Sequence, residues 1–420
     1  MRRAGRVFLL TILIAAAAQS VTAVEFADIY AWIGDLSYLN TSRNAGQTVF
    51  PTLLIPAGGE FEGMGQAYTA VARDVSFFDA NAAGSATLDY TELTFIHNDW
   101  IADTSLDGLV YAIRFENLGL AVAGKFLHVP FTAYDQFTHQ TASGRYSEGT
   151  VGLNVSYNLL SSYEFPGLAI GATIKTAYRY VPPAIARDQS AIGVAADIGV
   201  LTRFDFLKTF SSRQPNFAVG ASARNFGLPV DGQPLPSQIT AGLAYSPILP
   251  LTIATDLIVP VSLAPGVQPE SIGAAVGVAV DIAPFVSART GLLLRGPGSR
   301  FSVGATVDLA DVSIDINLNL DLVTQISSLD RFSVQARLNL GDQDRKQRRA
   351  LVDSYYLSAW INYVSGDLER SLRNALAALE IDPGFTPASD LLALLEQSID
   401  LDENMRAILS TAGNSDSEQP

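Results

Sequence analysis

Residues 312–322 read VSIDINLNLDL, a stretch in which apolar and polar side chains alternate without a break. A two-residue period predicts a β-strand with one apolar and one polar face. Residues 301–309 and 332–340 alternate in the same way, and only Ala310 and Asp311 separate the first of them from residues 312–322. Such tight connections indicate antiparallel hairpins.

Further segments of about ten residues alternate ahead of these three. They span residues 88–97, 107–115, 118–128, 149–159, 167–180, 189–202, 215–225, 237–246, 251–260, 271–282 and 285–295. The total is 14 predicted strands, each about as long as a tilted strand that crosses a bilayer. We therefore expect an all-β transmembrane barrel of about 14 antiparallel strands. A small C-terminal α-helical segment follows it, and the family resemblance given below implies an N-terminal hatch or plug ahead of it.

The composition favours a barrel. The 420 residues are 48% hydrophobic and only 16% charged, with no cysteine, whereas soluble domains carry about 25% charged residues. After the N-terminus the chain has no apolar run of the roughly 18 residues that a membrane helix needs. In hydrocarbon, strands satisfy all their backbone groups only in a closed barrel. A soluble protein made of two packed sheets is the alternative.

Connection lengths suggest an orientation. The connections after odd strands are mostly long, at 129–148, 226–236, 261–270 and 323–330, whereas 116–117, 283–284 and 310–311 are tight. Outer-membrane barrels have short periplasmic turns and longer external loops. The chain is therefore expected to enter and leave the barrel on the periplasmic side, although the connection 203–214 is an exception.

The N-terminus predicts export. Arginines at positions 2, 3 and 6 precede an apolar run at 7–18 and the small-residue end Val21-Thr22-Ala23, which is typical of a cleaved signal peptide; a membrane anchor is the alternative. Removing residues 1–23 leaves 24 Lys and Arg against 42 Asp and Glu, a net charge of −18. This charge argues against a nucleic-acid partner.

The predicted organisation has six parts. They are a signal peptide at 1–23, a segment at 24–86 that a family resemblance given below implies to be a hatch, a barrel at 87–341, a charged linker at 342–349, helices at 350–410 that resemble a tetratricopeptide repeat, and a disordered tail at 411–420.

Ahead of the barrel, the chain resembles a known family. Its motifs are Gly63-Met64-Gly65-Gln66-Ala67-Tyr68, then Ala70, Ala72 and Asp74, then Asn81-Ala82-Ala83-Gly84, then Thr91-Glu92-Leu93, with Ala195-Ala196-Asp197-Ile198-Gly199 and Arg224-Asn225-Phe226-Gly227 in the wall. These resemble the long-chain fatty acid transport (FadL-type) outer-membrane family and its PorV-like relatives. The resemblance covers about two thirds of the chain and implies a barrel of about 14 strands around a hatch.

We assign Gly63, Gly65, Asn81 and Gly84 to the hatch motif. The family usually has Asn-Pro-Ala where this chain has Asn81-Ala82-Ala83, so the rigid turn that proline provides is missing. A nucleotide-binding loop is the alternative for Gly63 and Gly65. Tyr68 stands where such a loop would have its third glycine, and no strand precedes the segment.

Strand parity points very small residues into the bore, among them Gly193, Ala195, Gly220, Gly277 and Ala279. The same parity places cations inside, namely Arg114, Lys125, Lys175, Arg179, Arg224 and Arg337. We assign Lys175, Arg179 and Arg224 to a carboxylate head group. Lys175 and Arg179 lie four residues apart on one strand face, where two cations can hold a carboxylate together. The alternative is that the cations pair with the hatch acids Glu60, Glu62, Asp74 and Asp79.

The apolar hatch residues Phe61, Met64, Phe77 and Phe78 are candidates for a tail pocket, or else they pack the plug. No catalytic spacing accompanies the three histidines, so we expect neither an enzyme nor a cofactor or metal. An outer-membrane hydrolase is the disfavoured alternative.

After Leu340 the sequence becomes helical. Residues 352–385 resemble one tetratricopeptide repeat, with Gly366-Asp367 at the inter-helix turn and Pro383 after the second helix. Tyr355 and Tyr363 are candidate partner-binding residues, since fewer than three repeats rarely stand alone. A solubilising tail is the alternative.

The expected function is passive uptake of long-chain fatty acids or other hydrophobic small molecules through a plugged barrel in the outer membrane of a diderm bacterium, with the C-terminal helices in the periplasm. Expected partners are outer-membrane lipid, the cargo, and a periplasmic protein bound by the helices. The alternative is a PorV-like anchor or assembly factor without a cargo of its own.

Overall fold

A computed structural model describes residues 46–56, 58–100, 104–162, 165–183, 189–212, 214–323 and 330–415. The predicted signal peptide and the first part of the predicted hatch, at 24–45, lie outside these ranges.

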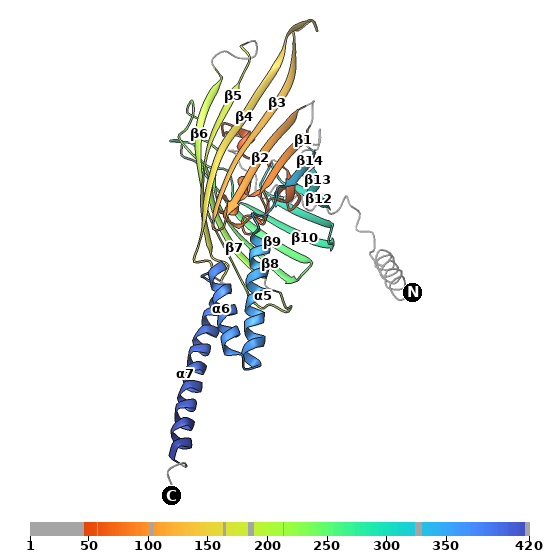
Figure 1. The fold of residues 1–420 in the computed structure, drawn as a ribbon. Helices are drawn as coiled ribbons and strands as arrows, with labels where there is room; N and C mark the ends of the chain where they lie inside the picture. The colour runs from red at the N-terminus through yellow and green to blue at the C-terminus, as the bar shows by residue number, and fades with distance from the viewer. Residues whose placement is uncertain are drawn as a thin grey trace, which may run out of the picture.

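Strands of the described chain form one closed antiparallel barrel (Figure 1). Their bounds are β1 Glu92–Asp99, β2 Ser105–Phe115, β3 Leu118–Tyr134, β4 Gln140–Leu159, β5 Leu168–Tyr180, β6 Ala191–Phe204, β7 Phe217–Phe226, β8 Ser237–Ile248, β9 Leu251–Val261, β10 Gly273–Ala283, β11 Val286–Leu294, β12 Arg300–Leu309, β13 Val312–Asp321 and β14 Arg331–Asn339. Each strand pairs with its sequence neighbours, and β1 closes against β14. The predicted fold class and the count of 14 strands are confirmed.

The two faces of each strand meet different surroundings. On β5, the inward residues Ala169, Thr173 and Lys175 are buried, whereas the outward Ile174 is 63% exposed. Outward Leu153 on β4 is 65% exposed as well. Large apolar side chains facing outward around a closed barrel are typical of a lipid-facing band.

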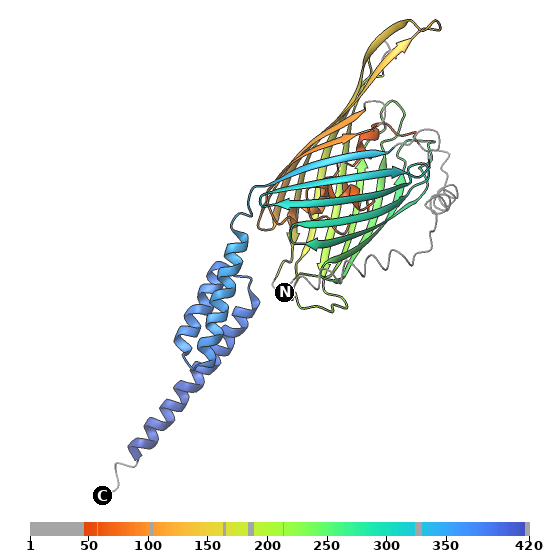
Figure 2. The ribbon, with the colours of Figure 1, turned by 90° about the vertical axis from the view of Figure 1, so that its right-hand side faces the viewer.

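The connection 129–148 is a correction to the sequence prediction. We expected a loop there, but β3 and β4 stay paired from Val129↔Tyr146 to Tyr134↔Gln140, and the hairpin projects beyond the barrel (Figure 2). The Asp135 carboxylate accepts the backbone N–H groups of Phe137 and His139 at 2.8 and 2.9 Å, which closes the turn. Both faces of this extension meet water, so no apolar period marks it.

After β14 the chain forms α5 Arg345–Val364, α6 Leu368–Ile381 and α7 Thr386–Ser415. Helix α5 begins within the stretch that we assigned to a linker, and α7 continues five residues into the predicted tail; residues 416–420 lie outside the described ranges. The start of α5 contacts the barrel rim, where Arg348 pairs with Glu116. Of the described helices, none is both long enough and apolar enough to cross a bilayer.

Candidate functional site

A hatch occupies the bore of the barrel (Figure 2). It comprises the described residues of 46–91 and includes η1 Pro51–Leu53, α3 Gly59–Gly63, α4 Phe77–Ala80 and η2 Ala82–Thr87. Its side chains form buried clusters with the inward residues of the wall, for example Phe77 with Leu201. The hatch is therefore the core of the barrel.

Ion pairs join the hatch to strands β11–β14. Glu60 lies 3.5 Å from Arg289, Glu62 lies 2.9 Å from Arg331, and Asp74 lies 3.1 Å from Arg337. Beyond β1 and β2, Asp79 pairs with Lys125 on β3 at 2.7 Å. Buried charges need such partners, so these contacts fix the hatch on two sides.

Glu60 is the most strongly compensated of these acids. Arg73 binds its carboxylate through two nitrogens, at 2.7 and 2.9 Å, and the Tyr68 hydroxyl oxygen lies 3.1 Å from it. Burial acts to raise the pKa of Glu60, but the charges of Arg73 and Arg289 outweigh it and lower the pKa to about 2. Glu60 therefore remains a carboxylate at neutral pH.

On the β4–β9 side the hatch is held by hydrogen bonds in which at most one partner carries a charge. The Asn81 amide donates to the Val200 carbonyl of β6 at 2.9 Å, and the Ser85 hydroxyl donates to Asn154 on β4 at 2.5 Å. Asp256 on β9 accepts the backbone N–H groups of Tyr68 and Thr69 at 3.1 and 2.9 Å. Few of these contacts are ion pairs, so separation on this side exposes few unpaired charges.

The small inward residues of the wall make room for the hatch backbone. A side chain at Gly291 on β11 would overlap the backbone of Met64, and one at Gly220 on β7 would overlap Thr69. A Cβ at Gly277 would lie 2.6 Å from the Met64 carbonyl oxygen. The space that these small inward residues leave is therefore filled by the plug at these positions.

The hatch motif lies where the hatch meets the wall. Gly65 has φ +61°, and a Cβ there would lie 2.6 Å from the Leu292 nitrogen, so both conformation and space require glycine. Gly63 contacts Arg289, and Gly84 contacts Phe77. Asn81 caps η2 by accepting the Ala83 N–H at 3.1 Å.

Two of the predicted tail residues contact predicted head-group cations. The Lys175 ammonium lies 5.5 Å from the ring centre of Phe78, and the Arg224 guanidinium lies 5.7 Å from that of Phe61. Met64 and Phe77 are fully buried within the plug.

The predicted head-group cations already have partners. Lys175 pairs with Asp197 at 2.6 Å, and Arg224 donates to the Asp79 carbonyl. Arg179 is apart from both, near the far end of β5, where it donates to the Gln189 carbonyl at 3.0 Å. The structure brings two of the three together with the aromatic hatch residues and leaves the third at the loops.

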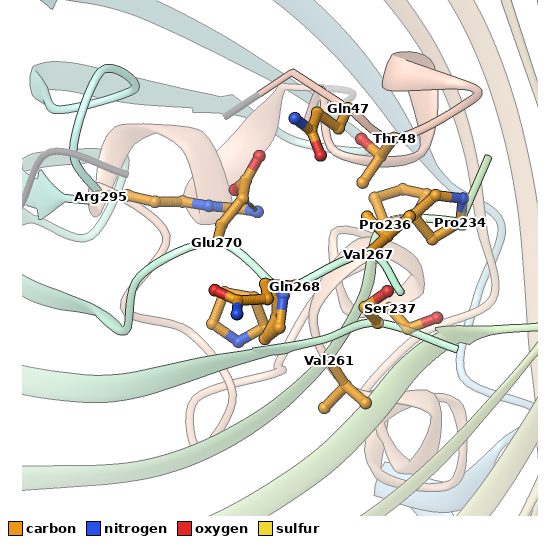
Figure 3. A pocket seen from close by; sticks show the side chains of 13 residues that line it. Gln47, Thr48, Pro234, Pro236, Ser237, Val261, Val267, Gln268, Glu270 and Arg295 are labelled. Carbon is orange, nitrogen blue, oxygen red and sulfur yellow. Dashed lines mark hydrogen bonds and ion pairs between the residues drawn. The ribbon is translucent and has the colours of Figure 1, made fainter. Parts of the chain in front are cut away.

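Two small cavities adjoin the hatch. One, beside Phe78, Asp79 and Lys125, has about 10 Å³ of free interior. The other has about 20 Å³ and lies among loops and strand ends, where Arg295 and Glu270 pair at 2.9 Å and face Pro234 and Pro236 (Figure 3). Each holds about one water molecule. A long alkyl chain fits neither as they stand.

Sequence reasoning missed several charged residues of the bore. Arg289 and Arg331 hold hatch acids, and the wall acids Asp197, Asp256 and Asp315 are at most 2% exposed. Asp315 forms an ion pair with Arg289, with 2.5 Å between the carboxylate oxygen and the guanidinium nitrogen. All five lie on the inward face of their strands, so the parity that located the other cations could have found them.

In the C-terminal helices the two predicted partner-binding tyrosines differ. Tyr355 is 37% exposed. Tyr363 packs against Trp360, with ring centres 5.6 Å apart. Within the described ranges, no group of three His, Cys, Asp or Glu side chains could hold a metal ion.

The fold and the site define a closed, plugged β-barrel with an apolar outer surface. The chain belongs to the family described as "Uncharacterised protein family (UPF0164)", whose profile matches residues 34–343. A UPF0164 protein of Treponema pallidum (strain Nichols) is 25% identical over 377 residues, which is 86% of each chain. A second one is 33% identical over 187 residues, covering 43% of this chain and 37% of the relative.

Two solved transporter structures are similar to this chain in part of their fold. The Ralstonia pickettii toluene transporter TbuX has a TM-score of 0.46 and 11% identity, covering 68% of this chain and 99% of that one. The Pseudomonas putida toluene transporter TodX has a TM-score of 0.45 and 13% identity, covering 67% and 96%. At these values the likeness says nothing about cargo.

Proposed function

We propose that this protein is an outer-membrane channel for passive uptake of long-chain fatty acids or similar hydrophobic molecules. The observation that carries the proposal is the pairing of aromatic hatch residues with buried cations of the wall, Phe78 with Lys175 and Phe61 with Arg224. Such a site offers apolar contact to a tail and positive charge to a carboxylate.

Cargo would enter from the loop end, bind at the hatch and leave beside α5. The short connections, such as 116–117 and 310–311, lie at the α5 end of the barrel, and short turns are typical of the periplasmic side. On this orientation the C-terminal helices are periplasmic. Because the cavities are water-sized, uptake requires the hatch to shift.

Lys175, Arg179 and Arg224 are the proposed head-group residues, and Phe61, Met64, Phe77 and Phe78 the proposed tail residues. Lys175 would exchange Asp197 for the cargo carboxylate, and Asp197 would keep the hydrogen bond that it accepts from the Asn225 backbone N–H at 2.7 Å. Phe78 would move first, because it already borders the cavity beside Lys125.

Mass spectrometry of protein extracted in mild detergent tests this proposal. We expect a bound fatty acid or similar lipid, and we expect Phe78→Ser to reduce its occupancy severalfold. The matched control is Phe115→Ser, because Phe115 is 47% exposed at the barrel rim. Wild-type protein that carries no lipid, even after incubation with oleate, would contradict the proposal.

A second candidate function is a PorV-like anchor or assembly factor, supported by an apolar stripe on α5. Leu357, Ile361 and Val364 recur at helical spacing and are 62%, 61% and 80% exposed, which is unusual for a helix without a partner. An anchor role predicts that the wild type binds no oleate, and that Leu357→Glu with Ile361→Glu removes a cross-linked periplasmic partner. No cross-linked partner in the wild type would exclude this role.

A further inference from the structure

Three arginines, Arg114, Arg203 and Arg345, lie at the α5 end of the barrel, which we call the mouth. Arg114 of β2 donates to the Leu88 carbonyl at 3.1 Å, Arg203 of β6 to the Val71 carbonyl at 2.8 Å, and Arg345 of α5 to the Asp89 carbonyl at 2.8 Å. All three acceptors are backbone atoms of the hatch. The cluster therefore surrounds the point where the hatch leaves the bore.

These arginines differ from the cations deeper in the bore. Lys125, Lys175 and Arg337 each have a carboxylate within 3.1 Å. Among the residues that the structure describes, no carboxylate lies within the 4.0 Å ion-pair distance of the three mouth arginines. Their acceptors are neutral, although a guanidinium binds a carboxylate more strongly than a carbonyl.

Nearby charges leave this mouth positive. The negative charge of Asp89 attracts all three arginines, and those of Asp342 and Glu116 attract Arg345 as well. The positive charges of Arg345 and Arg349 both repel Arg114. Asp281 of β10 lies at the same end of the barrel, and its charge acts on the hatch residue Arg73 but is not among the main influences on the three mouth arginines.

Arg345 also has an unused donor. Its Nη1 atom is buried and has no hydrogen-bond partner among the described residues, and an unpaired buried donor is costly. The three side chains remain partly exposed, so a solute at the mouth can reach them. One unused donor, neutral acceptors and excess positive charge together fit a monovalent anion.

We propose that Arg114, Arg203 and Arg345 form a carboxylate-binding site, which holds the head group of an amphipathic cargo molecule as it leaves the hatch. The inference rests on the proposed uptake function and adds an exit site to it. Each arginine that turns to the cargo gives up a hatch carbonyl. Binding at the mouth thereby weakens the attachment of the hatch end that blocks the exit.

Calorimetric titration of the full chain in lipid nanodiscs, with laurate and with dodecanol, tests the site. The two probes share a tail and differ in the charged group. For Arg114→Gln with Arg203→Gln we expect laurate affinity to fall about tenfold, with dodecanol affinity unchanged. Arg114→Lys with Arg203→Lys retains the charge and should restore most of the laurate affinity.

The control is Lys208→Gln, because Lys208 lies at the same end but pairs with Asp205 at 3.0 Å; its laurate affinity should match the wild type. If the double glutamine variant binds laurate like the wild type, the exit site is wrong and the uptake proposal survives. If the wild type binds neither laurate nor dodecanol, both are wrong.

Discussion

Asp74 of the hatch and Arg337 of the last strand lie 263 positions apart in the chain and form an ion pair of 3.1 Å. The Tyr68 hydroxyl donates to the same carboxylate at 2.7 Å. This contact joins the plug to the strand that closes the barrel, so hatch docking and barrel closure depend on one another.

Removal of this pair should destabilise the protein. Arg337→Gln leaves a buried carboxylate without its cation, which costs about 3 kcal/mol of the free energy of unfolding. Urea titration in micelles, followed by circular dichroism, measures the change. Arg349→Gln is the control and should change the free energy by less than about 0.5 kcal/mol, because Arg349 is exposed on α5. Equal values for the two variants would refute the structural role of the pair.

Glu60 predicts an acid-sensitive hatch. Its pKa falls from 4.5 in the unfolded chain to about 2 in the folded state, so its contribution is present above pH 4.5 and is lost as the pH falls toward 2. The full contribution is about 3 kcal/mol. Wild-type protein should lose stability across this range relative to Glu60→Gln, as measured by thermal midpoints at each pH. Parallel pH profiles for the two proteins would contradict this assignment.

Because hatch and wall lie in close contact at Gly291, we expect a larger residue there to make the barrel permeable to ions. In Gly291→Ala the new methyl group overlaps the Met64 backbone, so the hatch must shift and ion conductance in planar bilayers should rise severalfold. Gly124→Ala is the matched control, because the nearest atom to its methyl group would be the Thr150 carbonyl oxygen at 3.8 Å. If both variants are as closed as the wild type, the hatch does not seal the bore at Gly291.

The proposed head-group residues predict a binding defect. Lys175→Ala with Arg224→Ala should weaken oleate binding about tenfold, because the two cations beside the aromatic hatch residues are lost. Tryptophan fluorescence during oleate titration gives the affinity, and Arg145→Ala serves as a control on the projecting hairpin. Unchanged oleate affinity in the double variant would mean that the head group binds elsewhere.

The fold could be predicted from the sequence because the barrel wall repeats one physical rule. Alternation in residues 312–322 follows directly from lipid on one face and the bore on the other. The hairpin beyond residue 129 could not be predicted, since neither of its faces meets lipid.

The site was only partly predictable. Parity placed Lys125 and Lys175 inside, but their partners depend on how an irregular hatch packs, and residues 24–86 have no period. Lys125 meets the hatch residue Asp79, whereas Lys175 meets Asp197 of the neighbouring strand. Tertiary packing decides such a pairing, and local sequence patterns carry no information about it.

A locked hatch tests whether the plug gates uptake. The hydroxyl oxygens of Ser85 and Ser156 lie 2.5 Å apart, and the chain has no cysteine of its own. Ser85→Cys with Ser156→Cys can therefore form a single disulfide between hatch and wall. The reduced form of the same protein is the matched control.

The most direct measurement is the uptake of radiolabelled oleate by diderm cells that lack their own fatty-acid channel and express this chain. Wild-type and reduced double-cysteine protein should raise uptake severalfold above cells with an empty vector, and oxidation of the double-cysteine protein should abolish the increase. Uptake by wild-type cells no faster than by empty-vector cells, with the barrel present in the outer membrane, would contradict the account.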